Sequence, residues 1–275
     1  MAVEIKDMML DKVAAGPVAA RAYLGADYVK GPPVVLYFRS GAFVDYRVDI
    51  ECRAAETMAS TGAIVVMADY GTLSGGVFPK ALEVSFSVLS YFVNKRANKP
   101  VGLGDKKSPL FLAGTEAGGN IAAGVALKAR DAFPGVVGGQ ILMSPMVDPF
   151  MGTASVRHAD EIGMRARWSE GWSHYLGAAG CHPYAAPCMC SRISGVAPAL
   201  VMTSADDPLK DETISYADKL RAAGVEVFQQ ILPVGTGWPS IYGGAVQGST
   251  GEWPGLLGQH FEGFVKHIGD RPSTG

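Results

Sequence analysis

The chain has 275 residues, of which 48% are hydrophobic and 18% charged, and its net charge is −2. This length and apolar content allow one large α/β domain or two small ones with a sizeable core, and they exclude a disordered chain. The sequence shows no basic patch of the kind that nucleic-acid-binding proteins carry, so we expect no nucleic-acid partner.

The predicted elements start with an antiparallel lead-in, residues 4–13 and 18–23, on either side of a Gly16-Pro17 turn. Short runs rich in Val, Ile, Leu and Met then alternate with helix-length stretches, as in a sheet that is buried on both faces. The alternation predicts a doubly wound, mostly parallel α/β sheet with right-handed crossovers. The predicted strands span residues 34–38, 63–70, 110–114, 140–144, 199–204 and 225–232, and the predicted helices 48–60, 80–94, 118–130, 211–223 and 255–268.

One segment, residues 147–190, breaks this alternation because it contains no clear strand. It holds several Met, Trp and Tyr residues and a glycine-containing breaker at 177–180, which indicates a small helical lid inserted over the sheet edge. We expect the aromatic and Met side chains, Trp168 among them, to form the lid's own core rather than to contact a ligand. The whole chain, residues 1–275, is otherwise expected to form a single domain.

Three of the four cysteines lie in a cluster with His182, at Cys181, Cys188 and Cys190. Their spacing matches none of the usual structural zinc patterns, so reduced thiols are a better interpretation than a metal site. The N-terminus has no basic region followed by an apolar run, and no apolar stretch is long enough to span a bilayer. We therefore expect a cytoplasmic protein with no membrane partner, no metal and no cofactor.

The sequence Gly-Thr-Glu-Ala-Gly at 114–118 follows an apolar run and precedes an alanine-rich helical pattern. This strand–tight turn–helix context is that of a nucleophile elbow, in which the central residue is normally Ser. Here the central residue is Glu116, and a carboxylate lacks the nucleophilic chemistry of a serine hydroxyl.

Five motifs in order resemble the hormone-sensitive lipase-like branch of the α/β-hydrolases, of the bacterial acetyl-esterase type. They cover nearly the whole chain from residue 18 onward and imply an α/β-hydrolase fold. The motifs are Tyr-Phe-Arg-Ser-Gly-Ala-Phe at 37–43, Asp-Tyr-Gly-Thr-Leu at 69–73 with Phe-Pro-Lys-Ala at 78–81, Gly-Thr-Glu-Ala-Gly-Gly-Asn at 114–120, Pro-Tyr-Ala-Ala-Pro at 183–187, and Asp-Pro-Leu-Lys-Asp-Glu at 207–212.

The departures from this family lie at the catalytic positions. The resemblance implies that Asp207 is the acid, whereas Glu116 stands at the nucleophile position. The base would come from residues 232–238, which end at Trp238, and the resemblance places Thr236 where the family has histidine. Threonine has no useful basicity near neutral pH, so the triad is expected to be degenerate. His260 and His267 fall in the last predicted helix and are interpreted as structural or surface residues.

The resemblance places the oxyanion loop at residues 39–42. Its donors are backbone N–H groups, so Gly41 and Ala42, together with Ala117 after the elbow, remain candidates for charge stabilisation. Ser40 and Ala42 replace glycines, which restricts the backbone. Arg39 replaces a histidine, and two interpretations stand equally: an ion pair with Glu116, or a side chain that braces its own loop or faces solvent.

Three functions are compatible with these residues. The first is a non-hydrolytic pseudo-hydrolase that binds a small, partly apolar ligand. The second is a lyase, dehydratase or cyclase in which Glu116 is the general acid or base. The third is a hydrolase with Glu116 as a carboxylate nucleophile, which still lacks a base to activate water. A homodimer is possible, because members of this family often pair through the edge of the sheet.

Overall fold

In a computed structural model, which describes residues 3–25, 31–98, 103–105, 107–243 and 251–271, the core is one eight-stranded sheet in the order β1-β2-β4-β3-β5-β6-β7-β8. Strands β1 (Val3–Leu10) and β2 (Val18–Gly25) form an antiparallel pair, and β2 also runs antiparallel to β4 (Ile64–Ala68). All other neighbouring strands are parallel: β3 (Val34–Phe38), β5 (Leu110–Thr115), β6 (Val137–Met143), β7 (Ala199–Ser204) and β8 (Val227–Leu232).

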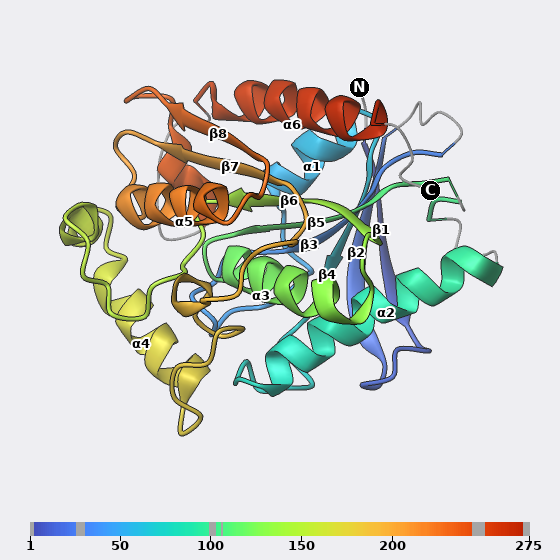
Figure 1. Ribbon diagram of the computed structural model, residues 1–275, viewed down its shortest axis with the longest axis horizontal. Helices are drawn as coiled ribbons and strands as arrows, with labels where there is room; N and C mark the ends of the chain where they lie inside the picture. Colours follow the sequence, from blue (N-terminus) through green and yellow to red (C-terminus); the bar gives the residue numbers. More distant parts are fainter. Residues whose placement is uncertain (1–2, 26–30, 99–102, 106, 244–250, 272–275) are drawn as a thin grey trace.

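Helices cover both faces of this sheet (Figure 1). On one face lie α1 (Arg53–Ser60) and α6 (Trp253–Gly269), which pack against each other. On the other face lie α2 (Lys80–Asn98) and α3 (Ala117–Ala132), while α5 (Lys210–Ala222) packs against β7 and β8. The mostly parallel, doubly wound sheet predicted from the sequence is therefore confirmed, including its antiparallel lead-in.

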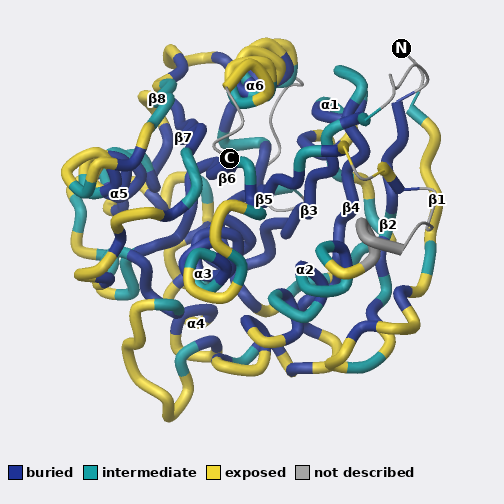
Figure 2. Tube along the Cα trace, turned by 45° about the vertical axis from the view of Figure 1, so that its right-hand side comes forward, coloured by how far each residue is buried: buried dark blue, intermediate teal, exposed yellow. Residues whose placement is uncertain are grey.

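The deepest part of the core lies around the central strands and α3. Every residue of β3, β4, β5 and β7 is buried, whereas β1 at the sheet edge is largely exposed (Figure 2). This difference explains why the central strands read as continuous apolar runs. The predicted helix 48–60 starts later, at Arg53, and the predicted helix 80–94 extends to Asn98.

The segment between β6 and β7 is helical and forms no strand in the described residues. It comprises the 3₁₀ helix η1 (Ser155–Asp160), helix α4 (Arg165–Leu176) and the 3₁₀ helix η2 (Pro187–Met189). Helix α4 approaches the loop after β3 very closely, because a Cβ atom on Gly171 would lie 2.0 Å from the carbonyl oxygen of Ala42. This places α4 directly over residues 39–43.

Candidate functional site

Glu116 occupies a sharp turn between β5 and α3. Its backbone has φ 55° and ψ −120°, a conformation that costs a non-glycine residue about 1–3 kcal/mol. The turn is tight enough that a Cβ atom on Gly118 would lie 1.9 Å from the carbonyl oxygen of Phe38. Strand β5 and helix α3 thus hold residue 116 in the strained geometry of an elbow, although its side chain is a carboxylate.

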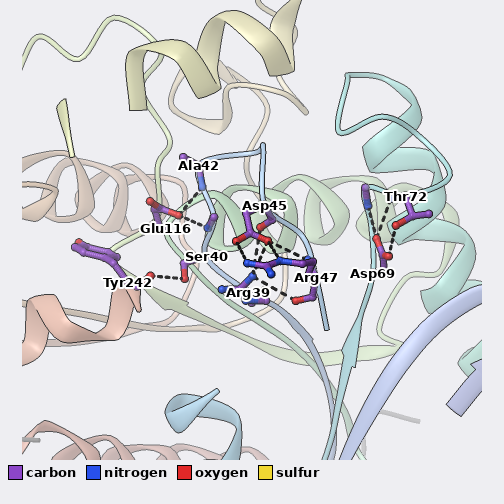
Figure 3. A network of polar contacts seen from close by, with 11 residues as sticks. Arg39, Ser40, Ala42, Asp45, Arg47, Asp69, Thr72, Glu116 and Tyr242 are labelled. Atoms are coloured by element: carbon purple, nitrogen blue, oxygen red, sulfur yellow. Dashed lines mark hydrogen bonds and ion pairs between the residues drawn. The ribbon is translucent and has the colours of Figure 1, made fainter. Parts of the chain in front are cut away.

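The carboxylate of Glu116 accepts hydrogen bonds from the backbone groups that the resemblance assigns to oxyanion stabilisation. Its Oε2 atom lies 2.6 Å from the amide nitrogen of Gly41, 2.8 Å from that of Ala42 and 3.5 Å from that of Ala117. We call these three N–H groups the oxyanion cradle; Figure 3 shows the contact between Glu116 and the amide of Ala42. In an ester hydrolase such donors stabilise the negative oxygen of the tetrahedral intermediate. Here the side chain of Glu116 fills the cradle.

The second oxygen of Glu116 faces helix α4. Its Oε1 atom accepts a hydrogen bond from the indole Nε1 of Trp168 at 2.5 Å. Both residues have no solvent exposure. A buried carboxylate needs donors for both oxygens, and these two sets of contacts supply them. Trp168 lies in the hydrophobic core, and its indole N–H also binds the elbow residue.

Arg39 braces its own loop and forms no ion pair with Glu116. Its Nη1 atom lies 3.3 Å from Asp45 Oδ1 and donates to the carbonyl oxygens of Asp45 and Arg47 (Figure 3). The guanidinium of Arg47 lowers the pKa of Asp45 to about 2, and the charge of Arg39 acts in the same direction. Of the two interpretations of Arg39, the loop-bracing one holds, because Asp45 on the same loop supplies its carboxylate.

The backbone of the loop turns its amide groups toward Glu116. Gly41 has φ 150° and Ala42 has φ 51°, so a non-glycine residue adopts the left-handed region inside the cradle. The hydroxyl of Ser40 points elsewhere and donates to the carbonyl oxygen of Tyr242 at 3.1 Å. Replacement of the family's glycines by Ser40 and Ala42 has therefore not removed the N–H donors.

Asp207 lies in a buried polar cluster with a tyrosine rather than a histidine. The hydroxyl of Tyr242 donates to both carboxylate oxygens, at 2.6 and 2.7 Å, and Ser144 Oγ donates at 2.8 Å. Burial raises the pKa of Asp207 to about 6, although these hydrogen bonds and one from the Leu209 amide lower it. Burial also raises the pKa of Tyr242 well above its usual range, and the neighbouring Asp207 adds to this effect.

Thr236 and Trp238 do not contact the carboxylate of Asp207. The hydroxyl of Thr236 donates to the carbonyl oxygen of Pro233 at 3.1 Å. The indole of Trp238 is buried and donates to Ser144 Oγ at 2.9 Å. Because Ser144 in turn donates to Asp207, Trp238 contacts the Asp207 cluster through Ser144. The position that faces Asp207 is taken by Tyr242, in the 3₁₀ helix η3 (Trp238–Tyr242).

Sequence reasoning missed two polar residues of the site, Ser144 and Tyr242, and the donor role of Trp168. One signal pointed toward Tyr242, because a buried Asp without a histidine partner needs another donor and Tyr242 follows the expected base loop. Tyr242 also links the two halves of the site, since its ring packs edge-on against Trp168 at a centroid distance of 5.6 Å. No comparable local pattern marks Ser144.

Glu116 does not line either of two cavities in the described structure. The larger has a volume of about 560 Å³ and lies between α4 and the loop at 149–151. The smaller, about 290 Å³, lies between the C-terminal ends of α3 and α6.

The four cysteines are free thiols, and no three described His, Cys, Asp or Glu side chains group closely enough to hold a metal ion. No described helix is long and apolar enough to cross a membrane.

Comparisons with known proteins agree with this fold. Residues 35–234 match the model of an α/β-hydrolase-fold family. The chain is 30% identical to the esterase LipI of Mycobacterium tuberculosis over 242 residues, which cover 82% of this chain and 71% of LipI. It is 29% identical to the gibberellin receptor GID1C of Arabidopsis thaliana over 213 residues, which cover 71% of this chain and 59% of the receptor.

A thermostable esterase from Pseudomonas putida has the same fold, with a TM-score of 0.80 and 24% identity over 97% of this chain and 83% of the esterase. Residues 35–234, which match the family model, include the elbow, the oxyanion loop and the strand that precedes Asp207. The chain therefore belongs to the α/β-hydrolase fold family, in its hormone-sensitive lipase-like esterase branch, and is related to carboxylesterases.

Proposed function

We propose that this protein is a non-hydrolytic member of its family that binds a small, partly apolar molecule. The observation that carries the proposal is the occupancy of the oxyanion cradle by Glu116. An ester carbonyl that entered this site would have to displace a carboxylate held by Gly41 and Ala42 at 2.6 and 2.8 Å. The donors that would stabilise the transition state are engaged by the protein itself.

The remaining chemistry of the site supports the same proposal. Ester hydrolysis by the usual route needs a nucleophile, a base that takes its proton and an acid that orients the base. Residue 116 provides no hydroxyl, and Asp207 is paired with the hydroxyl of Tyr242. A phenol whose pKa is raised by burial and by Asp207 gives up its proton less readily than a free tyrosine, so it does not replace the missing imidazole.

The two catalytic alternatives fit the geometry less well. A carboxylate nucleophile or a general acid–base needs an oxygen that can reach the substrate. Both oxygens of Glu116 are hydrogen-bonded, and Trp168 separates the residue from solvent. A binding role has a precedent in the family, because one relative is named as a gibberellin receptor.

The proposal is tested by measuring ester turnover and ligand binding on the same preparation. With p-nitrophenyl acetate and butyrate we expect no release of nitrophenol above the uncatalysed rate, while a related active esterase run in parallel gives turnover. A thermal-shift screen of small amphipathic compounds should yield at least one that raises the melting temperature of the wild type. Ester turnover that is abolished by Glu116→Gln in a folded protein would overturn the proposal.

A further inference from the structure

A described cavity lies outside the Glu116 site, between α4 and the loop at Pro149–Met151. Its volume of about 560 Å³ is within the range of pockets that hold drug-sized molecules, roughly 300–1,000 Å³. One wall is a continuous stripe of α4, in which residues recur at helical spacing. These residues are Arg165, Ser169, Trp172, Ser173 and Leu176.

The opposite wall comes from a loop that the protein holds in place. The amide of Phe150 donates to Asp148 Oδ1 at 3.0 Å, and the amide of Met151 donates to the carbonyl oxygen of Asp148 at 3.3 Å. Phe150 is 70% exposed, an unusual state for a phenylalanine that is fixed by its backbone. Most of the Phe150 ring is therefore not covered by other residues of the protein, and Phe150 lines the cavity.

Two donors on the α4 wall have no acceptor in the described structure. Trp172 is only 3% exposed and lines the cavity, yet its indole N–H donates to no described residue. This nitrogen is not one of the enclosed polar atoms without a partner, so its N–H opens onto the cavity and is available there as a hydrogen-bond donor to a ligand. Arg165 is the one charged residue among the described lining residues, and no described residue pairs with its guanidinium.

We propose that this cavity binds amphipathic organic anions, with the carboxylate or sulfonate on Arg165 and the apolar body between Phe150, Met151 and Leu176. A planar guanidinium suits a multi-oxygen anion, and the Trp172 N–H supplies a further donor to the same ligand. The inference rests on the proposed binding function, and it places the ligand away from the elbow. Trp168 contacts Glu116 and is not one of the cavity-lining residues, whereas Trp172, one turn further along α4, lines the cavity.

The probe for this site is 1-anilinonaphthalene-8-sulfonate, with N-phenyl-1-naphthylamine as its neutral counterpart without the sulfonate. Fluorescence titration of the wild type should show saturable binding of the sulfonate at one site per chain. Arg165→Ala should weaken the sulfonate about tenfold, as expected for loss of a charged hydrogen-bond partner, and should change binding of the neutral compound less than about twofold. Arg157→Ala, which removes an exposed arginine of η1 outside the cavity lining, is the matched control and should leave both unchanged.

Two further readouts locate the probe. Ser169→Trp and Ser173→Trp place bulk in the cavity from exposed positions of α4, and each should abolish binding of both compounds while the melting temperature shows a folded protein. The chain has four tryptophans, so ¹⁵N indole spectra are simple; the Trp172 signal, assigned with Trp172→Phe, should shift most on addition of the sulfonate. Sulfonate affinity that is indifferent to Arg165→Ala and to both cavity-filling variants would overturn the proposal.

The outcomes separate this inference from the proposed function. If the wild type hydrolyses esters while Arg165→Ala weakens sulfonate binding, the proposed anion site is supported and the proposed non-hydrolytic function is wrong. If no ester is hydrolysed and other compounds stabilise the wild type and Ser169→Trp equally, the protein is a binder whose site lies elsewhere, and this inference fails alone.

Discussion

Trp168 donates its indole N–H to Glu116 and thereby joins helix α4 to the turn between β5 and α3. The two residues are 52 positions apart in the sequence, and both are fully buried. In esterases of this fold the corresponding turn presents a nucleophile to substrate. In this chain the turn presents an acceptor to a helix of the same molecule, so the geometry of an active site is used for an internal contact.

Trp168→Phe should destabilise the protein by about 2–3 kcal/mol, because a buried carboxylate loses one of its donors. The matched control is Trp253→Phe, since Trp253 is also buried but donates to a neutral hydroxyl, Ser240 Oγ, at 2.9 Å. For this control we expect a loss of about 1 kcal/mol. The measurement is chemical denaturation of the three proteins, and equal losses in the two variants would contradict a charge-assisted contact at Trp168.

Glu116→Gln should lower the free energy of unfolding by about 2 kcal/mol. An amide offers one acceptor oxygen, so it cannot accept hydrogen bonds from the Gly41 and Ala42 amides and from Trp168 at once. Glu212→Gln provides the comparison, because Glu212 is a buried carboxyl group that accepts one backbone hydrogen bond, from the Val147 amide at 3.2 Å, and burial raises its pKa well above the usual range. There we expect a change within about 1 kcal/mol. A Glu116→Gln protein as stable as Glu212→Gln would contradict a stabilising role for the contacts of both Glu116 oxygens.

Asp207 should make folding stability decrease as the pH rises from about 4 to about 6. Its folded-state pKa of about 6 lies above the unfolded value near 3.8, so the folded state binds more protons in this window. The stabilising effect is fully present below the unfolded pKa and is lost as the pH rises through the folded pKa. Asp207→Asn removes the titrating group, so its stability relative to the wild type should rise by about 2–3 kcal/mol between pH 4 and pH 8. Denaturation curves at both pH values measure this difference, and a constant offset would contradict it.

Tyr242→Phe should destabilise the protein by about 2 kcal/mol at pH 8 and by less at pH 4. The hydroxyl of Tyr242 stabilises the charged form of Asp207, so its removal raises the pKa of Asp207 further above about 6. At pH 4 Asp207 is already protonated, and less is lost. Titration of the Asp207 carboxyl carbon by NMR in wild type and variant checks the direction; an unchanged or lowered pKa would be the contrary result.

Most of the fold was accessible from the sequence because it depends on local patterns. Residues 34–38 and 199–202 are continuous apolar runs, and they lie in β3 and β7. The Gly16-Pro17 turn separates two strands that pair along their whole length. The elbow position of Glu116 was also visible, since the surrounding glycines are needed where the strand turns sharply into a helix.

The contacts of the site were not accessible, because they depend on how distant segments pack. The sequence left open whether Arg39 pairs with Glu116, and only the position of Asp45 on the same loop decides this. The acceptor of the Trp168 indole depends on the placement of α4, which no local pattern fixes. Tyr242 lies in a glycine-rich stretch, where neither helical nor strand periodicity indicates which side chain turns inward.

The carboxylate in the oxyanion cradle is the side chain of Glu116, whose backbone is held in a strained turn. Its effective concentration at the cradle therefore exceeds the millimolar range that short flexible linkers give. Free acetate, and anionic mimics of the transition state such as phosphonates, would have to displace the tethered Glu116 carboxylate from the cradle in order to bind there. Reagents that label active serine hydrolases by binding in this cradle should leave the protein unlabelled. A survey of a cell's hydrolases with such reagents would therefore not detect it.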